Sequence, residues 1–285
     1  MELRTSHQLI LYLSLTLTLT LAFAFVSSLS SDRTSAMPPT PKQLILITGA
    51  NQGLGYYATQ QLAATGKYHI LMGSRDLKKA DKAIDDLVAD KSYNVSKSDI
   101  TPLQIDVTND ESIAGAANQV KQNFGSLDML LNNAGIATAQ AATSNQSLRE
   151  VYHEQFDVNV YGAAAVTEAF LPLLQRGSGK RIAFTSTGLS SLAKAADGTQ
   201  PVEKFPIYRT TKIALNMVML YYAKTLEAEG FVVSGPAPGF CATNLNGHAG
   251  KKDPREGATM LVKALIAPKQ EIHGHVFSDA GVAPW

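Results

Sequence analysis

The sequence has 285 residues, with 25 Lys and Arg against 24 Asp and Glu, and 45% of its residues are hydrophobic. This composition excludes a disordered chain, and the net charge of +1 provides no basic surface for nucleic acid. The single cysteine, Cys241, excludes an intramolecular disulfide and a thiolate metal cluster, and we predict no metal site.

An uncharged hydrophobic run occupies residues 9–26, and 14 of its 18 residues are apolar. About 17–25 such residues span a bilayer, so the favoured prediction is a membrane anchor with the folded domain in the cytoplasm. Two alternatives stay open. Translation could begin at Met37, which would leave a cytoplasmic protein, or residues 1–30 could be a cleaved secretory signal, which would give a secreted one. We therefore treat residues 1–42 as a separate segment and linker.

From residue 43 onward, short apolar runs alternate with segments of helical periodicity. Strands are predicted at residues 44–47, 68–72, 102–105, 127–131, 181–185, 231–234 and 275–277. Helices are predicted at residues 53–64, 77–88, 110–124, 150–175, 208–229 and 254–266. The sixth strand is expected to end near Ser234, because Pro236 cannot donate to a central ladder. Strands that alternate with helices predict one doubly wound α/β domain over residues 43–285, with about seven parallel strands and helices on both faces.

The turn after the first strand, residues 48–55, reads Thr-Gly-Ala-Asn-Gln-Gly-Leu-Gly. Glycines allow a tight turn and let backbone amides approach a pyrophosphate at the start of the following helix. The spacing Gly-x-x-x-Gly-x-Gly differs from the commoner Gly-x-Gly-x-x-Gly. We predict that a dinucleotide binds at this turn. The predicted contacts are Thr48, Gly49, Asn51, Gly53, Leu54 and Gly55.

The second predicted strand leads into Gly-Ser-Arg-Asp at residues 73–76. Enzymes selective for NAD place a carboxylate near this point, against the ribose 2′-hydroxyl. Arg75 instead offers a planar fork that suits a 2′-phosphate, and Ser74 can add a hydrogen bond. The pattern favours NADP(H), and NAD(H) stays open as an alternative.

Four further patterns follow along the chain. They are Asn-Asn-Ala-Gly at residues 132–135, an asparagine at position 159, Tyr-x-x-x-Lys at residues 208–212, and Pro-Gly-Phe-Cys-Ala-Thr at residues 238–243. With the glycine turn, these patterns resemble in order the motifs of the short-chain dehydrogenase/reductase family. The final residues, 277–285, look most like its carbonyl-reductase-like branch. The resemblance covers residues 43–285 and implies a Rossmann-type fold.

The resemblance also implies a role for individual residues. Asn133, Ala134 and Gly135 would border the nicotinamide ribose, Asp106 would contact the adenine, and Asn159 would hold a proton-relay water. Pro238, Gly239, Cys241 and Thr243 would contact the nicotinamide carboxamide. Gln52 stands where many NADP-dependent members have Lys or Arg, so one phosphate-binding cation is missing.

The predicted chemistry centres on Tyr208 and Lys212, which lie on the same face of a helix because they are four residues apart. A free tyrosine has a pKa of about 10, and a nearby positive charge favours the phenolate. We therefore expect Lys212 to lower the pKa of Tyr208, which exchanges a proton with the substrate oxygen. In the family, the lysine also binds the nicotinamide ribose, as Tyr208 and Lys212 would here.

A hydroxyl after the fifth strand would polarise the substrate carbonyl. Alignment on the paired serines of the family places this role on Thr187, with Ser186 as the alternative. Adjacent strand residues point to opposite faces, so only one of the two can reach the substrate.

The sequence thus predicts an NADP(H)-dependent oxidoreductase that interconverts a carbonyl and an alcohol, working as a carbonyl reductase of a small organic molecule. Two alternatives stay open: an NAD-dependent alcohol dehydrogenase working oxidatively, and an NADP-binding regulator without catalysis. Residues 188–207 and 244–256 are expected to wall the substrate site. The protein could be a homodimer or a monomer.

Overall fold

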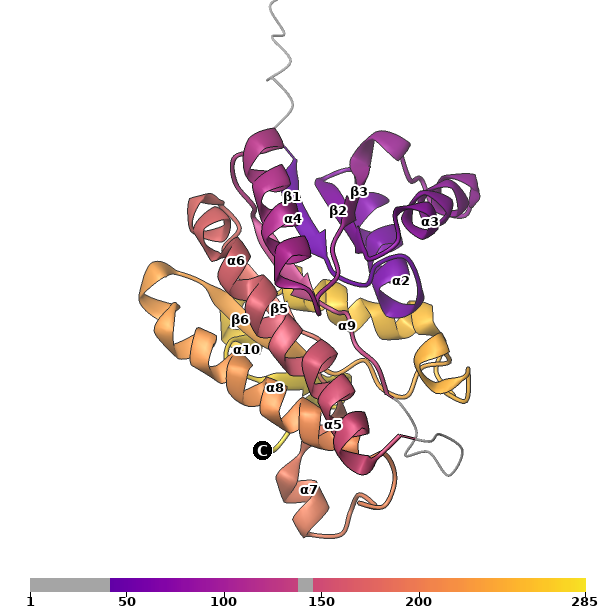
Figure 1. The fold of residues 1–285 in the computed structure, drawn as a ribbon, viewed down its shortest axis with the longest axis vertical. Coiled ribbons are helices and arrows are strands. Elements are labelled where there is room, and N and C mark those ends of the chain that lie inside the picture. The colour runs from indigo at the N-terminus through magenta and orange to yellow at the C-terminus, as the bar shows by residue number, and fades with distance from the viewer. Residues whose placement is uncertain (1–41, 138–145) are drawn as a thin grey trace, which may run out of the picture. The chain divides into compact units, whose positions relative to one another are not determined.

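The computed structural model describes residues 42–137 and 146–285, which contain an eight-stranded sheet flanked by helices (Figure 1). The strands are β1 (Gln43–Ile47), β2 (Tyr68–Ser74), β3 (Ile100–Gln104), β4 (Met129–Asn132), β5 (Arg181–Phe184), β6 (Val232–Pro236), β7 (Val276–Ser278) and β8 (Gly281–Val282). Their order is β3-β2-β1-β4-β5-β6-β7-β8, with parallel neighbours except for β7 and β8. The predicted Rossmann-type doubly wound fold is confirmed. The short antiparallel β8 is an addition that carries too few residues for a periodic signal.

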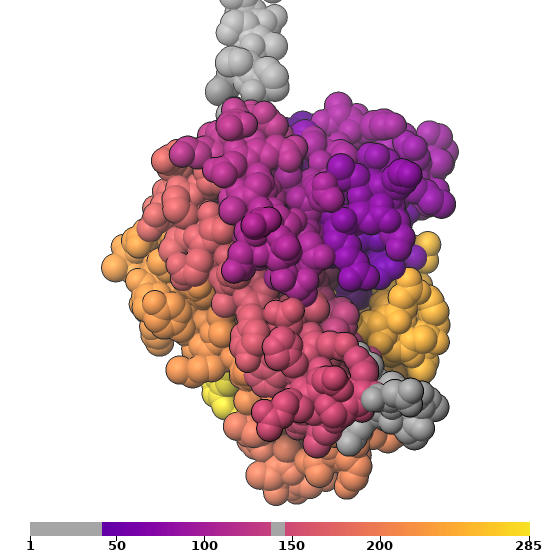
Figure 2. Space-filling view, in the orientation of Figure 1, coloured from indigo at the N-terminus to yellow at the C-terminus, as the bar shows by residue number. Residues whose placement is uncertain are grey.

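Helices cover both faces of the sheet. They are α2 (Gly53–Ala63), α3 (Leu77–Ala89), α4 (Asp110–Asn123), α5 (Leu148–Phe156), α6 (Gly162–Arg176), α7 (Leu192–Ala196), α8 (Pro206–Thr225), α9 (Pro254–Ile266) and α10 (Lys269–Ile272). Figure 1 shows α4, α6 and α8 over one face, with α2, α3 and α9 over the other. In the space-filling view of Figure 2, the first group hides most of the sheet. Side-chain caps begin several of the helices, as at Asp76, Asn109, Ser147 and Asp253.

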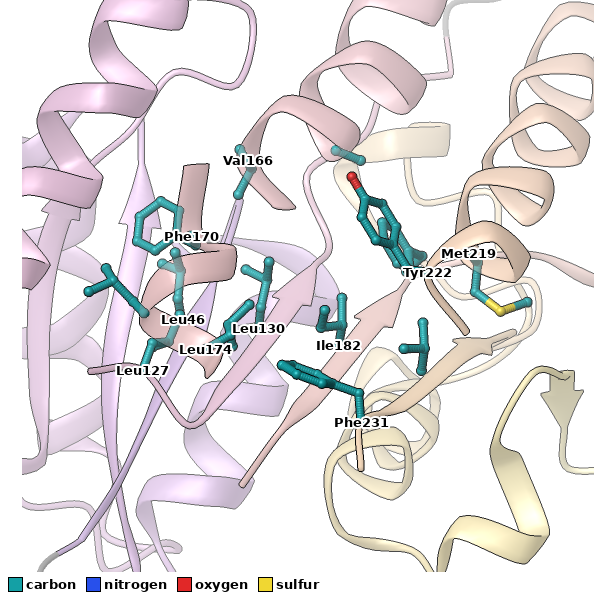
Figure 3. Close-up of a cluster of buried hydrophobic side chains, with 14 of the residues drawn as sticks. Leu46, Leu127, Leu130, Val166, Phe170, Leu174, Ile182, Met219, Tyr222 and Phe231 are labelled. Carbon is teal, nitrogen blue, oxygen red and sulfur yellow. The ribbon is translucent and has the colours of Figure 1, made fainter. Parts of the chain in front are cut away.

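The strands β1 to β7 each contribute to two hydrophobic cores, because successive side chains point to opposite faces. In β1, Leu46 belongs to the core under α4, α6 and α8, whereas Ile45 and Ile47 belong to the core under α2, α3 and α9. Figure 3 shows the first core, where Phe170 of α6 and Tyr222 of α8 pack over the strands. This two-sided burial explains why the strands are continuously apolar.

The prediction that β6 ends near Ser234 is wrong, since the strand continues to Pro236. The carbonyl oxygen of Pro236 accepts from the amide of Ser186, on the β5 side. The residue pairs between β5 and β6 end at Ser234, and on the other side of β6, Pro236, the last residue of the strand, pairs with Phe277 of β7. A proline is tolerated at such a position.

The predicted continuous helix over residues 150–175 is divided into α5, a π-helical turn η2 (Asp157–Tyr161), and α6. Gly162, at the start of α6, lies so close to Val107 that an added Cβ would collide with the Val107 carbonyl oxygen. The π-turn carries Asn159, and such turns frequently occur at functional sites.

The predicted membrane anchor at residues 9–26 lies outside the described residues. Within residues 42–137 and 146–285, no helix combines the length and apolarity needed to cross a membrane.

Candidate active site

A cleft of about 900 Å³ opens at the carboxyl ends of the central strands. It lies where β1 pairs with both β2 and β4, which is the point where the winding of the chain reverses. Ligands of doubly wound sheets bind at this place. Most predicted site residues line the cleft. They are Gly49, Asn51, Gly53, Leu54, Ser74, Arg75, Asp106, Asn133, Ala134, Gly135, Ser186, Thr187, Tyr208, Lys212, Pro238, Gly239, Cys241 and Thr243.

Two constraints, a left-handed backbone and close packing, explain the three glycines of the turn. Gly49 and Gly53 have φ values of 62° and 58°, in the left-handed region that favours glycine. An added Cβ at Gly55 would lie 2.6 Å from Asn133 Nδ2 and 2.8 Å from the Gly49 carbonyl oxygen. Gly55 therefore permits close packing behind the turn and is not among the lining residues.

The start of α2 is open to an anion. Within the described chain, its first turn contains no acidic residue, and the side chain of the N-cap residue Gln52 makes no capping bond. The first amides of a helix lack intrahelical partners and carry the positive end of its dipole. They can therefore bind a phosphate group.

Thr48 fastens the turn to β4 from behind the cleft. Its Oγ1 accepts from the amides of Asn133 and Ala134, both at 3.0 Å, and Asn133 Nδ2 donates to the carbonyl oxygens of Thr48 at 2.9 Å and Gly49 at 3.2 Å. Thr48 is buried, so its place is structural, and the ligand-facing contribution comes from the backbone that it positions.

The end of β2 presents a free cation. Arg75 is exposed, lines the cleft, and forms no ion pair with any residue that the structure describes. Asp76 is turned away to cap α3, with Oδ1 accepting from the Lys79 amide at 3.3 Å. Ser74 Oγ donates to the Asp76 carbonyl oxygen at 2.9 Å, so its proton is already committed.

Asp106 follows β3, the strand that pairs with β2, and lines the cleft as a carboxylate on the same side as Arg75. Its Oδ1 accepts from the amide and hydroxyl of Thr108, at 3.0 and 2.8 Å. The Thr108 hydrogen bonds, followed by the charge of Arg75, lower the pKa of Asp106 below its ordinary value. The carboxylate is therefore ionised at neutral pH, and the hydrogen bonds from Thr108 fix its orientation.

Tyr208 and Lys212 meet on α8 as predicted, with Lys212 Nζ 5.6 Å from the centre of the Tyr208 ring. Lys212 Nζ donates to the Thr185 carbonyl oxygen at 2.8 Å. The expected lowering of the Tyr208 pKa is wrong on this geometry, because desolvation raises the pKa of the phenol. The same desolvation lowers the pKa of Lys212 to about 8.

The two candidate hydroxyls after β5 differ in their partners. Ser186 Oγ is buried and donates to Asn216 Oδ1 at 2.6 Å. Thr187 Oγ1 accepts from the Leu189 amide at 3.2 Å, and no described residue accepts its proton. The Thr187 hydroxyl thus keeps a proton that can be donated to a ligand.

Asn159 is buried and lies behind the cleft, outside its lining. Its Oδ1 accepts from the Ile136 amide at 2.8 Å, and its Nδ2 donates to the Ile136 carbonyl oxygen at 2.8 Å and to Thr211 Oγ1 at 3.0 Å. Its side chain holds the segment after β4 against α8, and its water-holding role stays a prediction.

The turn at residues 238–243 closes the far side of the cleft. Thr243 and Asn246 form a reciprocal capping box at η5 (Asn244–Asn246). Cys241 Sγ is buried against the Pro238 carbonyl oxygen, and burial raises the pKa of the thiol. A thiol with a raised pKa is a weak nucleophile. Any contact of Cys241 with the cofactor is therefore expected through its backbone.

Two residues of the site, Asn216 and Thr211, were not predicted from the sequence. Asn216 Nδ2 donates to Ser190 Oγ at 2.9 Å, and Ser190 Oγ donates to the Thr187 carbonyl oxygen at 2.6 Å. Thr211 Oγ1 donates to the Tyr208 carbonyl oxygen at 2.7 Å and accepts from Asn159. Their polar side chains within an apolar helix are the signal that could have found them.

Comparison with known families decides the class of protein. The model of the short chain dehydrogenase family matches residues 43–254. The chain belongs to this family. It is 42% identical over 251 residues to the short-chain dehydrogenase anuI of Penicillium roqueforti, covering 85% of this chain and 96% of that protein. A (+)-neomenthol dehydrogenase of Capsicum annuum is 27% identical and covers 84% of this chain and 96% of its own.

Solved structures share the fold. NADPH-bound carbonyl reductase from chicken fatty liver superposes with a TM-score of 0.72 at 23% identity, over 86% of this chain and 100% of that one. Salutaridine reductase from Papaver somniferum gives 0.69 at 24% identity, over 84% and 100%. The predicted family is confirmed, and the chain is an oxidoreductase that acts on CH–OH groups.

Proposed function

We propose that the protein is an NADP(H)-dependent carbonyl reductase that converts the carbonyl group of a small organic molecule to an alcohol. The observation that carries the choice of cofactor is the unpaired guanidinium of Arg75 at the end of β2, among the residues that the structure describes. Asp76, the neighbouring carboxylate, is engaged with the Lys79 amide and does not compete for a ribose hydroxyl. A structure named as NADPH-bound carbonyl reductase and another named with NADP bound share the fold, which supports the same choice.

The residues present fit such a cofactor. The open start of α2 offers amides to the pyrophosphate, the close-packed glycine turn leaves space above it, and Arg75 offers two parallel donors to a 2′-phosphate. When bound, NADPH supplies a hydride to the carbonyl carbon of the substrate.

The chain supplies the proton and the polarising groups. Tyr208 donates its phenolic proton to the carbonyl oxygen, and Thr187 Oγ1 donates a hydrogen bond to that oxygen. The raised pKa of Tyr208 keeps the phenol protonated before the reaction. The charge of Lys212 stabilises the phenolate that remains afterwards. In the oxidative direction, Tyr208 takes the proton back.

A regulator without catalysis would need none of these three side chains. The cleft nevertheless brings Tyr208, Lys212 and Thr187 together in one lining, which supports an enzyme. The oxidative alternative draws support from the relative named (+)-neomenthol dehydrogenase. Comparing initial rates with NADPH and a ketone against NADP⁺ or NAD⁺ and the matching alcohol separates the two directions.

The decisive experiment is calorimetric titration of the protein with NADPH and, separately, with NADH. We expect preference for NADPH in the wild type, and Arg75→Ala to weaken NADPH binding about tenfold or more with little effect on NADH, because the lost charge-assisted pair faces only the 2′-phosphate. Lys78→Ala, which removes a neighbouring exposed cation, is the control. Equal losses for both cofactors would refute the assignment of Arg75.

The catalytic assignment has its own test in Tyr208→Phe, which removes one oxygen. Cofactor binding should persist while turnover falls by about two or more orders of magnitude, the usual contribution of general acid catalysis. A variant that retains the wild-type rate would exclude Tyr208 as the proton donor.

On sequence grounds, we also propose that residues 9–26 anchor the protein to a membrane with its folded domain in the cytoplasm. Mass spectrometry of the native protein distinguishes a start at Met1, a start at Met37 and cleavage near residue 30. Carbonate extraction of the membrane fraction tests the anchor itself.

A further inference from the structure

Apolar side chains from the turn at residues 238–243, from the segment after it and from the segment before Tyr208 line part of the cleft, and we call them its apolar wall. We define the wall by five side chains from segments far apart in the sequence. They are Leu189, Pro201, Phe205, Phe240 and Leu245. Among the described residues that line the cleft, Asp106 is the only carboxylate, and it belongs to the opposite, cofactor end. Gln200 and Lys204 line the cleft beside Pro201 and Phe205, so this wall offers polar as well as apolar contacts, and its five apolar side chains favour a ligand with a large apolar part.

Several members of this wall are large apolar groups that remain exposed. Phe205 is 36% exposed, Phe240 is 48% exposed and Leu245 is 39% exposed. Removing apolar side-chain surface from water is favourable, so a ligand that covers these groups gains binding free energy. Exposed apolar groups that gather at a cleft mark a binding surface for an apolar ligand.

Phe205 has a backbone conformation that is unfavourable for a phenylalanine. It has φ 57° and ψ 48°, in the left-handed region that is unfavourable for a residue with a Cβ atom. It is also the N-cap residue of α8, and its side chain makes no capping bond to any described residue. Asn or Gly would suit both the conformation and the cap better.

The position of this strain connects it to the reaction. Pro206 follows as the first residue of α8, and Tyr208 lies less than one turn farther along the same helix. Phe205 and Tyr208 line the same cleft. Strained residues that persist beside an active site point to a use of the side chain that outweighs the backbone cost.

We propose that Phe205 is a specificity-determining residue, and that with Phe240 it forms a subsite for an uncharged aromatic or similarly bulky ring attached to the substrate carbonyl. This inference rests on the proposed carbonyl reductase function and narrows its substrate class. A ring bound there would cover the exposed faces of the wall and leave its carbonyl oxygen toward Tyr208.

The test compares two vicinal diketones that differ by one ring, 1-phenyl-1,2-propanedione and 2,3-butanedione. We expect the wild type to show a kcat/KM at least tenfold higher for the phenyl compound with NADPH. Phe205→Asn should lower this ratio by about tenfold, mainly through a higher KM, and leave NADPH binding unchanged. Phe124→Asn, which removes an exposed phenylalanine at the end of α4, is the matched control.

Thermal unfolding separates loss of the ring from loss of the fold. Phe205→Asn and Phe205→Gly should melt at or above the wild-type temperature, since both residues suit the left-handed backbone. A wild type that treats the two diketones alike, or an Asn variant with an unchanged ratio, would overturn the proposal.

Failure of the proposed function would look different, because no NADPH would then be oxidised with either diketone. In that event, calorimetric binding of the phenyl compound to protein saturated with NADP⁺ decides the subsite. Binding that Phe205→Asn weakens about tenfold would support it, and absence of binding to the wild type would refute it.

Discussion

Ser186 and Thr187 are adjacent in the chain, but their hydroxyl groups differ in whether the proton is already donated in a hydrogen bond. The proton of Ser186 is donated to Asn216, and the proton of Thr187 has no acceptor among the described residues. Asn216 also holds Ser190, whose hydroxyl binds the Thr187 carbonyl oxygen. The buried Ser186–Asn216 pair is therefore a support that fixes the turn, and Thr187 is the hydroxyl that this turn presents.

This difference predicts separable effects of two substitutions. Thr187→Val should reduce kcat by about 10²–10³, as the loss of one donor to a developing oxyanion does, with little change in stability. Ser186→Ala should instead lower the free energy of unfolding by about 1–3 kcal/mol, because it leaves Asn216 Oδ1 buried without its donor. Steady-state kinetics and chemical denaturation check both. If Ser186→Ala caused the larger loss of kcat, the two roles would be reversed.

Lys212 predicts the pH dependence of the reaction. Burial lowers its pKa to about 8, so the ammonium that stabilises the Tyr208 phenolate is lost as pH rises through this value. We expect kcat/KM for reduction to fall above about pH 8. In Lys212→Arg, the fall should move to higher pH, because a guanidinium does not deprotonate in this range. A wild-type profile that stays flat to pH 10 would contradict the assignment.

The same pKa has a consequence for stability, with the opposite sign. Between pH 8 and the ordinary lysine value of 10.5, the unfolded chain holds a proton that the folded protein has released. The free energy of unfolding should therefore rise with pH across this window through Lys212. Comparing denaturation of the wild type and Lys212→Met at pH 7.5 and 9.5 isolates this contribution.

Among the elements, the π-turn η2 connects the packing of α6 to the position of residues that line the cleft. Gly162 brings α6 against Val107, and Asn159 in the same turn holds Ile136 at the cleft. A side chain at position 162 would push this helix away from Val107 and shift Asn159 with it.

We accordingly expect Gly162→Ala to lower the free energy of unfolding by about 1–3 kcal/mol, the range for an overpacked site. It should also weaken cofactor binding, because the segment after β4 borders the cleft. Gly115→Ala is the matched control, since its added Cβ meets no described atom within 4 Å and α4 should gain about 0.5–1 kcal/mol. Urea denaturation of both variants checks the prediction; equal stabilisation would show that η2 adapts freely.

Element boundaries show where sequence reasoning reached its limit. The glycine turn, Tyr208 and Lys212 were predictable because their spacing is local. The π-turn was not, because the collision at Gly162 involves Val107, distant in sequence. Nor did the sequence reveal that β6 could include Pro236, since that depends on where the β5 ladder ends. Asn216 finds its partners 30 and 26 residues away, and the left-handed backbone of Phe205 leaves no trace in composition.

At the scale of the whole molecule, exposed apolar side chains occur on η2 and α8, two elements that pack against each other. Met217 and Tyr221 of α8 are 67% and 56% exposed, and Tyr161 of η2 is 55% exposed. We predict that this surface of η2 and α8 pairs with a second copy of the chain, so that the protein forms a homodimer, one of the two alternatives left open by the sequence.

Sedimentation equilibrium should then give a mass of about twice 30.5 kDa for the wild type. Tyr221→Glu should yield monomers, because it would bury a charge in the apolar contact. Ile266→Glu, at the end of α9 on the opposite face of the sheet, should leave the dimer intact. A wild type that sediments as a monomer at micromolar concentration would refute the expectation.

One hydrogen bond at the last residue has a practical consequence for handling the protein. The amide of Ala193, in α7, donates to the carbonyl oxygen of Trp285 at 2.7 Å, and the Ala283 amide donates to Val276 of β7 at 2.8 Å. These two hydrogen bonds connect the C-terminal residues 283–285 to β7 at one end and to α7 at the other. Helix α7 lies within residues 188–207, the segment expected to wall the substrate site. An affinity tag fused after Trp285 would pull on that wall and alter substrate KM, whereas a tag placed ahead of β1 would act at the opposite ends of the strands.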